Sequence, residues 1–179
     1  MPGDLIRPAR GAGDLDCARA LFRAYESGLG VSLCFQGFDR ELAALPDKYV
    51  PPRGDLWLAF VDGTARGCVA LRPLPDDAHD ADVVELKRLY VADEARGRGL
   101  GRRLAEVAID HARAAGARTM KLDTLAHMDA ARALYADLGF VSGSAPKARA
   151  FGAALEEELA HVRAFLRASS AADLKTKPA

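Results

Sequence analysis

The sequence predicts one α/β domain with helices on both faces of a central sheet. Three observations support this class: a hairpin signature in the first half, strand and helix patterns that alternate after it, and a high apolar content. The chain has 179 residues, of which 50% are hydrophobic. That length supplies one well-buried core and is short for two. We expect the domain to occupy residues 1–168 and the polar segment 169–179 to be a disordered tail.

The first elements follow from apolar periodicity and from turn residues. Leu5–Pro8 is expected to form an opening strand, and Asp14 to cap a helix whose apolar positions recur every three or four residues. Gly28 or Gly30 ends that helix, because glycine readily takes the left-handed conformation. A short second helix is expected over Asp39–Leu45.

A β-hairpin is the clearest local prediction. Leu56–Val61 is a continuous apolar run, Asp62-Gly63 is a turn that needs positive φ, and Arg66–Leu74 is the returning strand. Beyond the hairpin the pattern alternates between strand and helix. The expected elements are a strand at Val83–Val91, a helix at Leu100–Ala115, a strand at Thr119–Leu122, a helix at Met128–Leu138 and a strand that starts at Gly139.

The C-terminal part departs from this alternation. Its apolar residues follow helical spacing, at Leu155, Leu159, Val162, Phe165 and Leu166. Acidic residues begin the run and arginines end it, which suits the helix dipole. We therefore expect a helix over Ala153–Arg167.

Composition excludes several classes of function. Lys plus Arg and Asp plus Glu both number 25, so neither nucleic acid nor a membrane is expected as a partner. Cys17, Cys34 and Cys68 lack paired spacing, which disfavours a disulfide framework and a zinc site. No cationic N-terminal stretch leads into an apolar run, and the longest apolar segment is Leu56–Val61. We expect a cytoplasmic protein without a bound metal.

The most informative motif is a glycine-rich segment, Arg96–Gly101, with the sequence Arg-Gly-Arg-Gly-Leu-Gly. It joins a predicted strand to a predicted helix. Glycine lets the backbone approach a ligand closely, and the helix N-terminus presents unpaired N–H groups and partial positive charge. The segment therefore predicts a site for a phosphate-bearing ligand.

Two common nucleotide signatures fail at this segment. The phosphate loop of nucleotide triphosphatases requires Gly-Lys-Ser/Thr, whereas Arg102-Arg103 follows the last glycine. The dinucleotide fingerprint G-x-G-x-x-G fails because the glycines stand at 97, 99 and 101. Asp123 does end the next strand, where a ribose-binding acid would stand. A dinucleotide-dependent oxidoreductase therefore stays as a minor alternative.

The spacing Arg96-x-x-Gly99-x-Gly101, after the strand residues Leu86–Val91, resembles the acyl-coenzyme A motif of the GNAT superfamily of N-acetyltransferases. A second block, Ala131-x-x-Leu134-Tyr135-x-x-Leu138-Gly139-Phe140, is similar to another motif of that family. The resemblance covers about residues 5–141. It implies a mixed, mostly antiparallel sheet whose two central strands splay apart. Relatives usually have a last strand where this sequence predicts a helix, so a helix is expected to replace that strand.

The resemblance implies acetyl-CoA as the cosubstrate. Its pyrophosphate would lie across the N–H groups of the loop, and its amide-like pantetheine arm would pair with the edge of the preceding strand. The implied cofactor-binding residues are Leu89, Tyr90, Val91, Arg96, Gly97, Arg98, Gly99, Leu100, Gly101 and Arg102.

Two residues are candidates for the chemistry. Tyr135 matches the family position whose hydroxyl protonates the coenzyme A sulfur, and a tyrosine pKa near ~10 lies above a thiol pKa near ~8.5. Its helical spacing is equally typical of a core residue. Glu85 stands where many relatives carry the general base. The alternative for Glu85 is an ion pair with Lys87 on the same strand face or with Arg88 after a bulge.

The acceptor side is implied to lie between the first helix and the hairpin. The expected substrate-binding residues are Phe35, Gln36, Phe38, Glu41 and His127, with Tyr49 beside them. This set suits a small polar or cationic amine, although ordinary packing explains each residue as well. The implied activity is direct transfer of an acetyl group to a primary amine of a small molecule or peptide. The alternative is an acyl-coenzyme A binding module that lacks an acceptor site, and a homodimer is left open.

Overall fold

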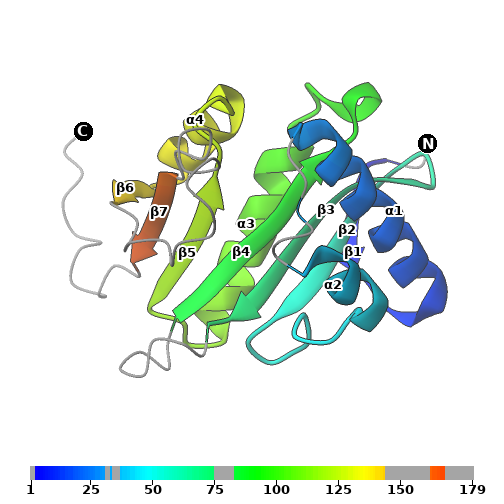
Figure 1. Ribbon diagram of the computed structural model, residues 1–179, viewed down its shortest axis with the longest axis horizontal. Helices are drawn as coiled ribbons and strands as arrows, with labels where there is room; N and C mark the ends of the chain where they lie inside the picture. The colour runs from blue at the N-terminus through cyan, green and yellow to red at the C-terminus, as the bar shows by residue number, and fades with distance from the viewer. Residues whose placement is uncertain (1–2, 31–32, 34–36, 75–82, 144–161, 168–179) are drawn as a thin grey trace.

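The computed structural model describes residues 3–30, 33, 37–74, 83–143 and 162–167. Its centre is a seven-stranded sheet in the order β1-β2-β3-β4-β5-β7-β6 (Figure 1). The strands are β1 (Leu5–Pro8), β2 (Asp55–Val61), β3 (Thr64–Pro73), β4 (Val83–Val91), β5 (Thr119–Thr124), β6 (Val141–Gly143) and β7 (Val162–Arg167). Only the β4–β5 pair is parallel among them. The predicted mixed, mostly antiparallel sheet is therefore confirmed.

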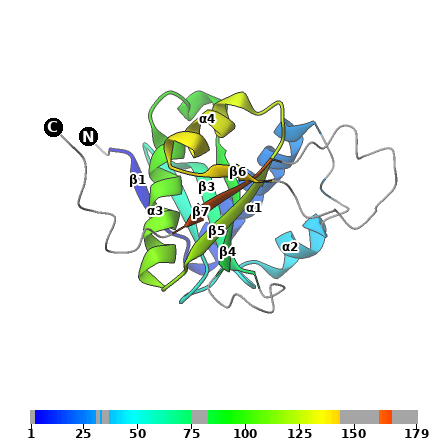
Figure 2. The ribbon, with the colours of Figure 1, turned by 90° about the vertical axis from the view of Figure 1, so that its left-hand side faces the viewer.

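Helices cover both faces of the sheet. The helices are α1 (Gly11–Leu29), α2 (Phe38–Ala44), the short 3-10 turn η2 (Asp93–Ala95), α3 (Leu100–Ala114) and α4 (Asp129–Asp137). In Figure 2, α3 and α4 lie on one side of the sheet, and α1 and α2 lie on the other. No helix in the described ranges is both long and apolar enough to cross a membrane.

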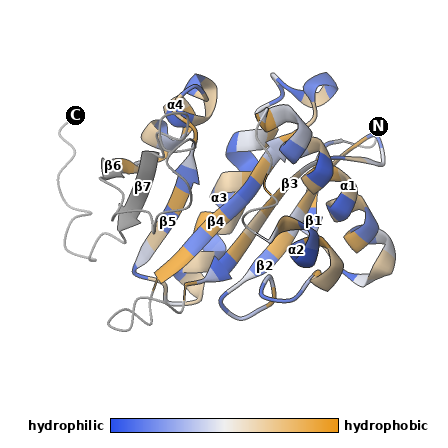
Figure 3. Cartoon of the chain, in the orientation of Figure 1, coloured by the Kyte–Doolittle hydropathy of each residue, from blue (hydrophilic) through white to orange (hydrophobic). Residues whose placement is uncertain are grey.

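Each face carries its own hydrophobic core, because side chains alternate along the strands. Leu71, Val84, Leu104 and Leu122 belong to the core beneath α3, and each is at most 1% exposed. Leu58 and Phe22 belong to the core beneath α1 and α2. Polar residues interrupt this pattern on β4 (Figure 3). Those interruptions lie on the α1 and α2 side and form much of the candidate site.

As far as the start of β6 the predicted boundaries hold closely, with a correction at the start of α1. The helix begins at Gly11 and its N-cap is Arg10, so Asp14 lies in the first turn. Asp14 accepts a hydrogen bond from the Arg10 backbone N–H at 2.7 Å. The hydrogen bond from Arg7, then that from Arg10, lowers the pKa of Asp14 to about 2. Asp14 therefore stabilises the helix N-terminus from inside the helix rather than as its cap.

The expected C-terminal helix is wrong where the structure describes it. Residues Val162–Arg167 form β7, which pairs antiparallel with β5 on one side and with β6 on the other. A run of six residues is too short for apolar periodicity to separate a strand from a helix. The exposed edge of β5 decides the outcome, because its backbone groups need partners. Residues 153–161 and the predicted tail, 169–179, lie outside the described ranges.

The two central strands part from one another. β4 pairs with β5 only where Val83–Glu85 meets Thr119–Lys121, although both strands continue beyond this point. Arg88 lies in β4 at a φ of 56°, and the register with β3 shifts there. This β-bulge increases the local twist and turns the end of β4 away from its neighbour. Figure 1 shows the divergence between the two strands.

Candidate active site

The glycine-rich loop ends at the N-terminus of α3. Gly97 and Gly99 have φ values of 76° and 72°, in the left-handed region that favours glycine. Gly99 is the N-cap of α3, no side chain caps this helix, and its first turn contains no acidic residue. Leu100 is 1% exposed and fixes the turn against the core. The first N–H groups and the positive end of the helix dipole are therefore available to an anion.

The arginines around this loop are all paired with carboxylates. The pairs are Arg96–Asp93, Arg98–Asp4, Arg102–Asp137 and Arg103–Asp4, with nitrogen–oxygen distances of 2.7, 2.7, 2.6 and 3.9 Å. All four arginine side chains are more than 40% exposed. Exposed ion pairs of this kind contribute little to stability. The arginines can therefore exchange a carboxylate for a phosphate at small cost.

The end of β4 lies next to the loop. Beyond Glu85 this strand pairs only with β3 within the described ranges. Its other edge, at Leu89–Val91, therefore faces the region where β4 and β5 diverge. Gly101 lies between Val91 of this edge and Leu134 of α4. A Cβ added at Gly101 would lie 3.9 Å from Val91 Cγ2 and 3.8 Å from Leu134 Cδ2. The loop, an unpaired strand edge and α4 therefore meet at one place.

Tyr135 follows Leu134 on α4. Its side chain is 8% exposed and packs edge-on against Phe140, with ring centroids 5.7 Å apart. Its hydroxyl makes no hydrogen bond to any residue that the structure describes. Burial, followed by the nearby Tyr25, raises the pKa of Tyr135 above its ordinary value. At neutral pH the hydroxyl is therefore a protonated donor, and none of the described residues accepts its hydrogen bond.

Glu85 lies on β4 and is 7% exposed. Its Oε2 accepts a hydrogen bond from Arg72 Nε of β3 at 2.6 Å, and Lys87 Nζ lies 3.5 Å from its Oε1. The ion pair with Lys87 agrees with one alternative from the sequence, whereas Arg88 pairs elsewhere. Of the two carboxylate oxygens, Oε1 therefore has the looser contact.

Glu41 and Phe38 were expected to line the acceptor pocket, and the structure places both in the core. Glu41 accepts hydrogen bonds from Arg88 Nε at 3.0 Å and Arg88 Nη2 at 2.8 Å, and from the Tyr49 hydroxyl at 2.6 Å. Phe38 is 1% exposed, and the Arg88 guanidinium lies 5.1 Å from the centre of its ring. Both oxygens of Glu41 are thus occupied within the protein, so this carboxylate is not free to bind a cationic amine.

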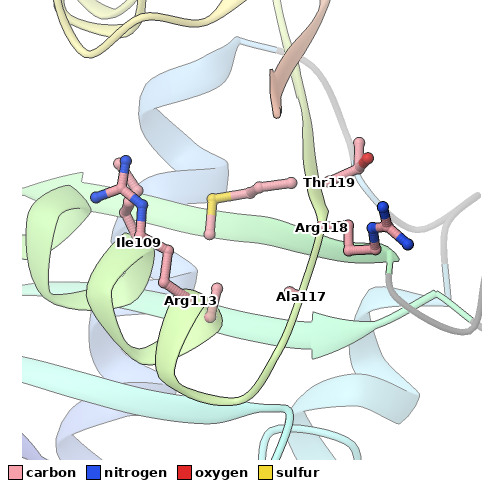
Figure 4. A pocket seen from close by; sticks show the side chains of 7 residues that line it. Ile109, Arg113, Ala117, Arg118 and Thr119 are labelled. Atoms are coloured by element: carbon pink, nitrogen blue, oxygen red, sulfur yellow. The ribbon is translucent and has the colours of Figure 1, made fainter. Parts of the chain in front are cut away.

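The remaining predicted acceptor residues are not brought into this arrangement. Phe35 and Gln36 lie outside the described ranges, and His127 is exposed in the loop between β5 and α4. A shallow hollow lined by Ile109, Arg113, Ala117, Arg118 and Thr119 lies near the C-terminal end of α3 (Figure 4). Because the glycine loop is at the other end of α3, this hollow is separate from the candidate site.

Sequence reasoning missed three residues that organise the site. Asp4 pairs with two loop arginines, Arg72 holds Glu85, and Arg88 holds Glu41. Arg88 was considered only as a partner of Glu85. A left-handed residue inside a strand has no local sequence signal when that residue is arginine. The pairs become visible only once the strand register and the bulge are known.

Comparisons with known proteins identify the family. Residues 19–140 match the model of the acetyltransferase (GNAT) family. An uncharacterized N-acetyltransferase of Schizosaccharomyces pombe is 40% identical over 128 residues, which are 71% of this chain and 76% of that protein. N-acetylaspartate synthetase of Rattus norvegicus is 39% identical over 106 residues, which are 56% of this chain and 32% of that protein.

The fold is also found among solved structures. A Salmonella typhimurium protein solved with its cofactor acetyl-CoA superposes with a TM-score of 0.71 at 19% identity, covering 93% of this chain and 94% of that one. At this identity the likeness is one of fold. The family model itself spans the glycine loop, the splayed strands and α4. The chain belongs to the GNAT family of acetyltransferases and is an acyltransferase.

Proposed function

We propose that the protein transfers an acetyl group from acetyl-CoA directly to a primary amine of a small molecule or peptide, with both substrates bound at once. The observation that carries this proposal is the meeting of the glycine loop, the unpaired edge of β4 and the Tyr135 helix around Gly101. An anion-binding turn, an edge that pairs with amides and a protonated hydroxyl are the groups needed by a thioester on a phosphate-bearing carrier.

The residues around the loop fit the carrier. The N–H groups from Gly99 to Arg102 would hold the pyrophosphate, since no side chain caps them. Arg96 and Arg98 would reach the remaining phosphate, because both side chains are exposed; Arg96 would exchange its contacts with Asp93 and the Val91 carbonyl, and Arg98 its contact with Asp4. The backbone of Leu89–Val91 would pair with the pantetheine arm as an added strand does. Acetyl-CoA then supplies an acetyl group activated as a thioester.

The transfer needs a neutral amine and a stabilised leaving thiolate. The amine nitrogen attacks the thioester carbonyl carbon, the C–N bond forms, and the C–S bond breaks with its electron pair on sulfur. We assign removal of the amine proton to Glu85 Oε1, directly or through water, and stabilisation of the carbonyl oxygen to a backbone N–H near Val91. The Tyr135 hydroxyl donates a hydrogen bond to the leaving sulfur. Because its pKa is raised, this hydroxyl remains protonated throughout.

Cofactor preference provides the test. Acetyl-CoA at about 100 times its Kd should raise the free energy of unfolding by about 2.7 kcal/mol. NAD at the same concentration should leave stability unchanged, because the loop lacks the dinucleotide glycine spacing. Equilibrium unfolding in urea with and without each ligand measures both effects. Stabilisation by NAD and not by acetyl-CoA would instead support the oxidoreductase alternative.

A further inference from the structure

We propose that the acceptor amine carries a carboxylate, as an amino acid does, and that the Lys87 ammonium binds this carboxylate. The inference rests on the proposed acetyl transfer and assigns the class of its acceptor. It follows from the charged side chains that β3, β4 and α2 bring to the α1 and α2 side of the sheet, beside the proposed base, Glu85.

This group of side chains, which we call the β4 charge cluster, contains Arg72, Lys87, Arg88, Glu41 and Glu85. Three of its members are cations and two are carboxylates. Glu41 is occupied by Arg88, and Glu85 has its short contact with Arg72. Among the residues that the structure describes, the carboxylate contact of Lys87 is the one between its Nζ and Glu85 Oε1 at 3.5 Å, and Arg72 already neutralises that carboxylate. Within the β4 charge cluster, the Lys87 ammonium is therefore the positive charge that is not matched by a carboxylate of its own.

The neighbouring strand does not remove this surplus. Met120 and Leu122 of β5 face the core beneath α3, so Lys121 and Asp123 alternate to the other face, with Lys121 in register with Glu85 and Asp123 beyond the last β4–β5 pair. They add one charge of each sign. Lys87 is also largely buried, with its side chain 18% exposed. Burial lowers its pKa, which reflects the cost of keeping an ammonium away from water. An anionic group of the acceptor would offset that cost.

The same cluster disfavours a polycationic acceptor. Glu41, the carboxylate expected to attract a cationic amine, has both oxygens filled by Arg88 and Tyr49. A net positive environment also favours loss of the proton from a bound ammonium, which is the state required for attack. This environment favours an amino-acid-like acceptor in two ways. Lys87 attracts its carboxylate, and its amine is more readily deprotonated next to Glu85.

Matched acceptor pairs provide the test. Initial rates of coenzyme A release would be measured with amino acids, with the corresponding amino acid amides and with a polyamine. We expect a kcat/KM at least about tenfold higher for an amino acid than for its amide, as a charged hydrogen bond implies. The preference is informative because amidation lowers the pKa of the α-amine and would by itself favour the amide. Equal rates, or a preference for the polyamine, would overturn the inference.

Variants at Lys87 assign the preference to this residue. Lys87→Met should raise KM for the amino acid by about tenfold and leave kinetics with the amide nearly unchanged, and Lys87→Arg should restore most of the preference. Lys48→Met is the matched control, since it removes the same charge outside the cluster. Equal losses for both acceptors with Lys87→Met would show a structural role and overturn the assignment. Thermal protection of the coenzyme A complex by the amino acid gives a second readout that needs no turnover.

Failure of the inference and failure of the proposed function are distinguishable. Acetylation of amides or polyamines without any preference for a carboxylate retains the acetyltransfer and contradicts the role of Lys87. Absence of acetyl-CoA binding, together with absence of product from every acceptor, contradicts the proposed function and the inference with it.

Discussion

Replacing Tyr135 with Phe is expected to lower kcat by about 100-fold, because a positioned hydrogen-bond donor that stabilises developing negative charge, here on the leaving sulfur, contributes about this much. The ring keeps its packing against Phe140, and the hydroxyl makes no hydrogen bond to the described residues, so the free energy of unfolding should hardly change. The affinity for acetyl-CoA should also persist. Steady-state kinetics with a coenzyme A thiol assay measures the loss.

Tyr49→Phe provides the matched contrast. The Tyr49 hydroxyl donates to the buried Glu41 carboxylate at 2.6 Å, and losing it should cost about 1.5–3 kcal/mol of stability with little effect on kcat. Both substitutions remove a phenolic oxygen. Tyr135→Phe should lower kcat and leave stability nearly unchanged, whereas Tyr49→Phe should lower stability and leave kcat nearly unchanged. If Tyr135→Phe destabilised the fold and left kcat intact, Tyr135 would be a core residue and its proposed role would be lost.

Replacing Arg88 with Met is expected to destabilise the protein by about 3–5 kcal/mol. The Arg88 and Glu41 side chains are 3% and 6% exposed, so the substitution leaves a buried carboxylate without its counter-charge. Equilibrium unfolding in urea at pH 7 measures this loss. The double variant Glu41→Gln, Arg88→Met removes the stranded charge and should recover much of the stability. An equal loss in both variants would show that packing, rather than charge, explains the effect.

The same pair gives stability a pH dependence. Burial alone would raise the pKa of Glu41, but the hydrogen bonds and charge of Arg88 outweigh it and hold the pKa below the ordinary value. The folded state therefore binds fewer protons at this carboxyl than the unfolded state does. This contribution is complete above the unfolded pKa, near ~4.3, and is lost as pH falls through the folded pKa. The double variant should lack this part of the acid sensitivity.

Local sequence signals predicted most of the fold. The Asp62-Gly63 turn, the glycine loop and the helix that starts at Leu100 each depend on neighbouring residues alone. β7 could not be predicted, because the apolar positions in its six residues fit both the strand period and the helix period. Pairing with β5 decides that these residues form a strand. That strand extends the sheet beyond β5. A binding module without an acceptor side would follow from a helix in place of the last strand, whereas the structure has the strand β7 at Val162–Arg167.

The candidate site was only partly predictable for the same reason. Its cofactor side is one continuous segment with a recognisable spacing. Its acceptor side depends on contacts between distant residues: Arg88 lies 47 residues from Glu41, and Arg98 lies 94 residues from Asp4. The family resemblance assigned Glu41 to the acceptor side, because it lies in the segment between the first helix and the hairpin. Arg88, at the bulge, donates hydrogen bonds to both carboxylate oxygens of Glu41.

The most direct test of the account is release of the coenzyme A thiol from acetyl-CoA in the presence of an amine panel, with mass spectrometry of the amines. The account predicts thiol release that depends on at least one amine, matched mole for mole by that amine acetylated on nitrogen. Binding of acetyl-CoA without acetylation of any amine in a panel of amino acids, amides, polyamines, aminoglycosides and peptides would contradict it.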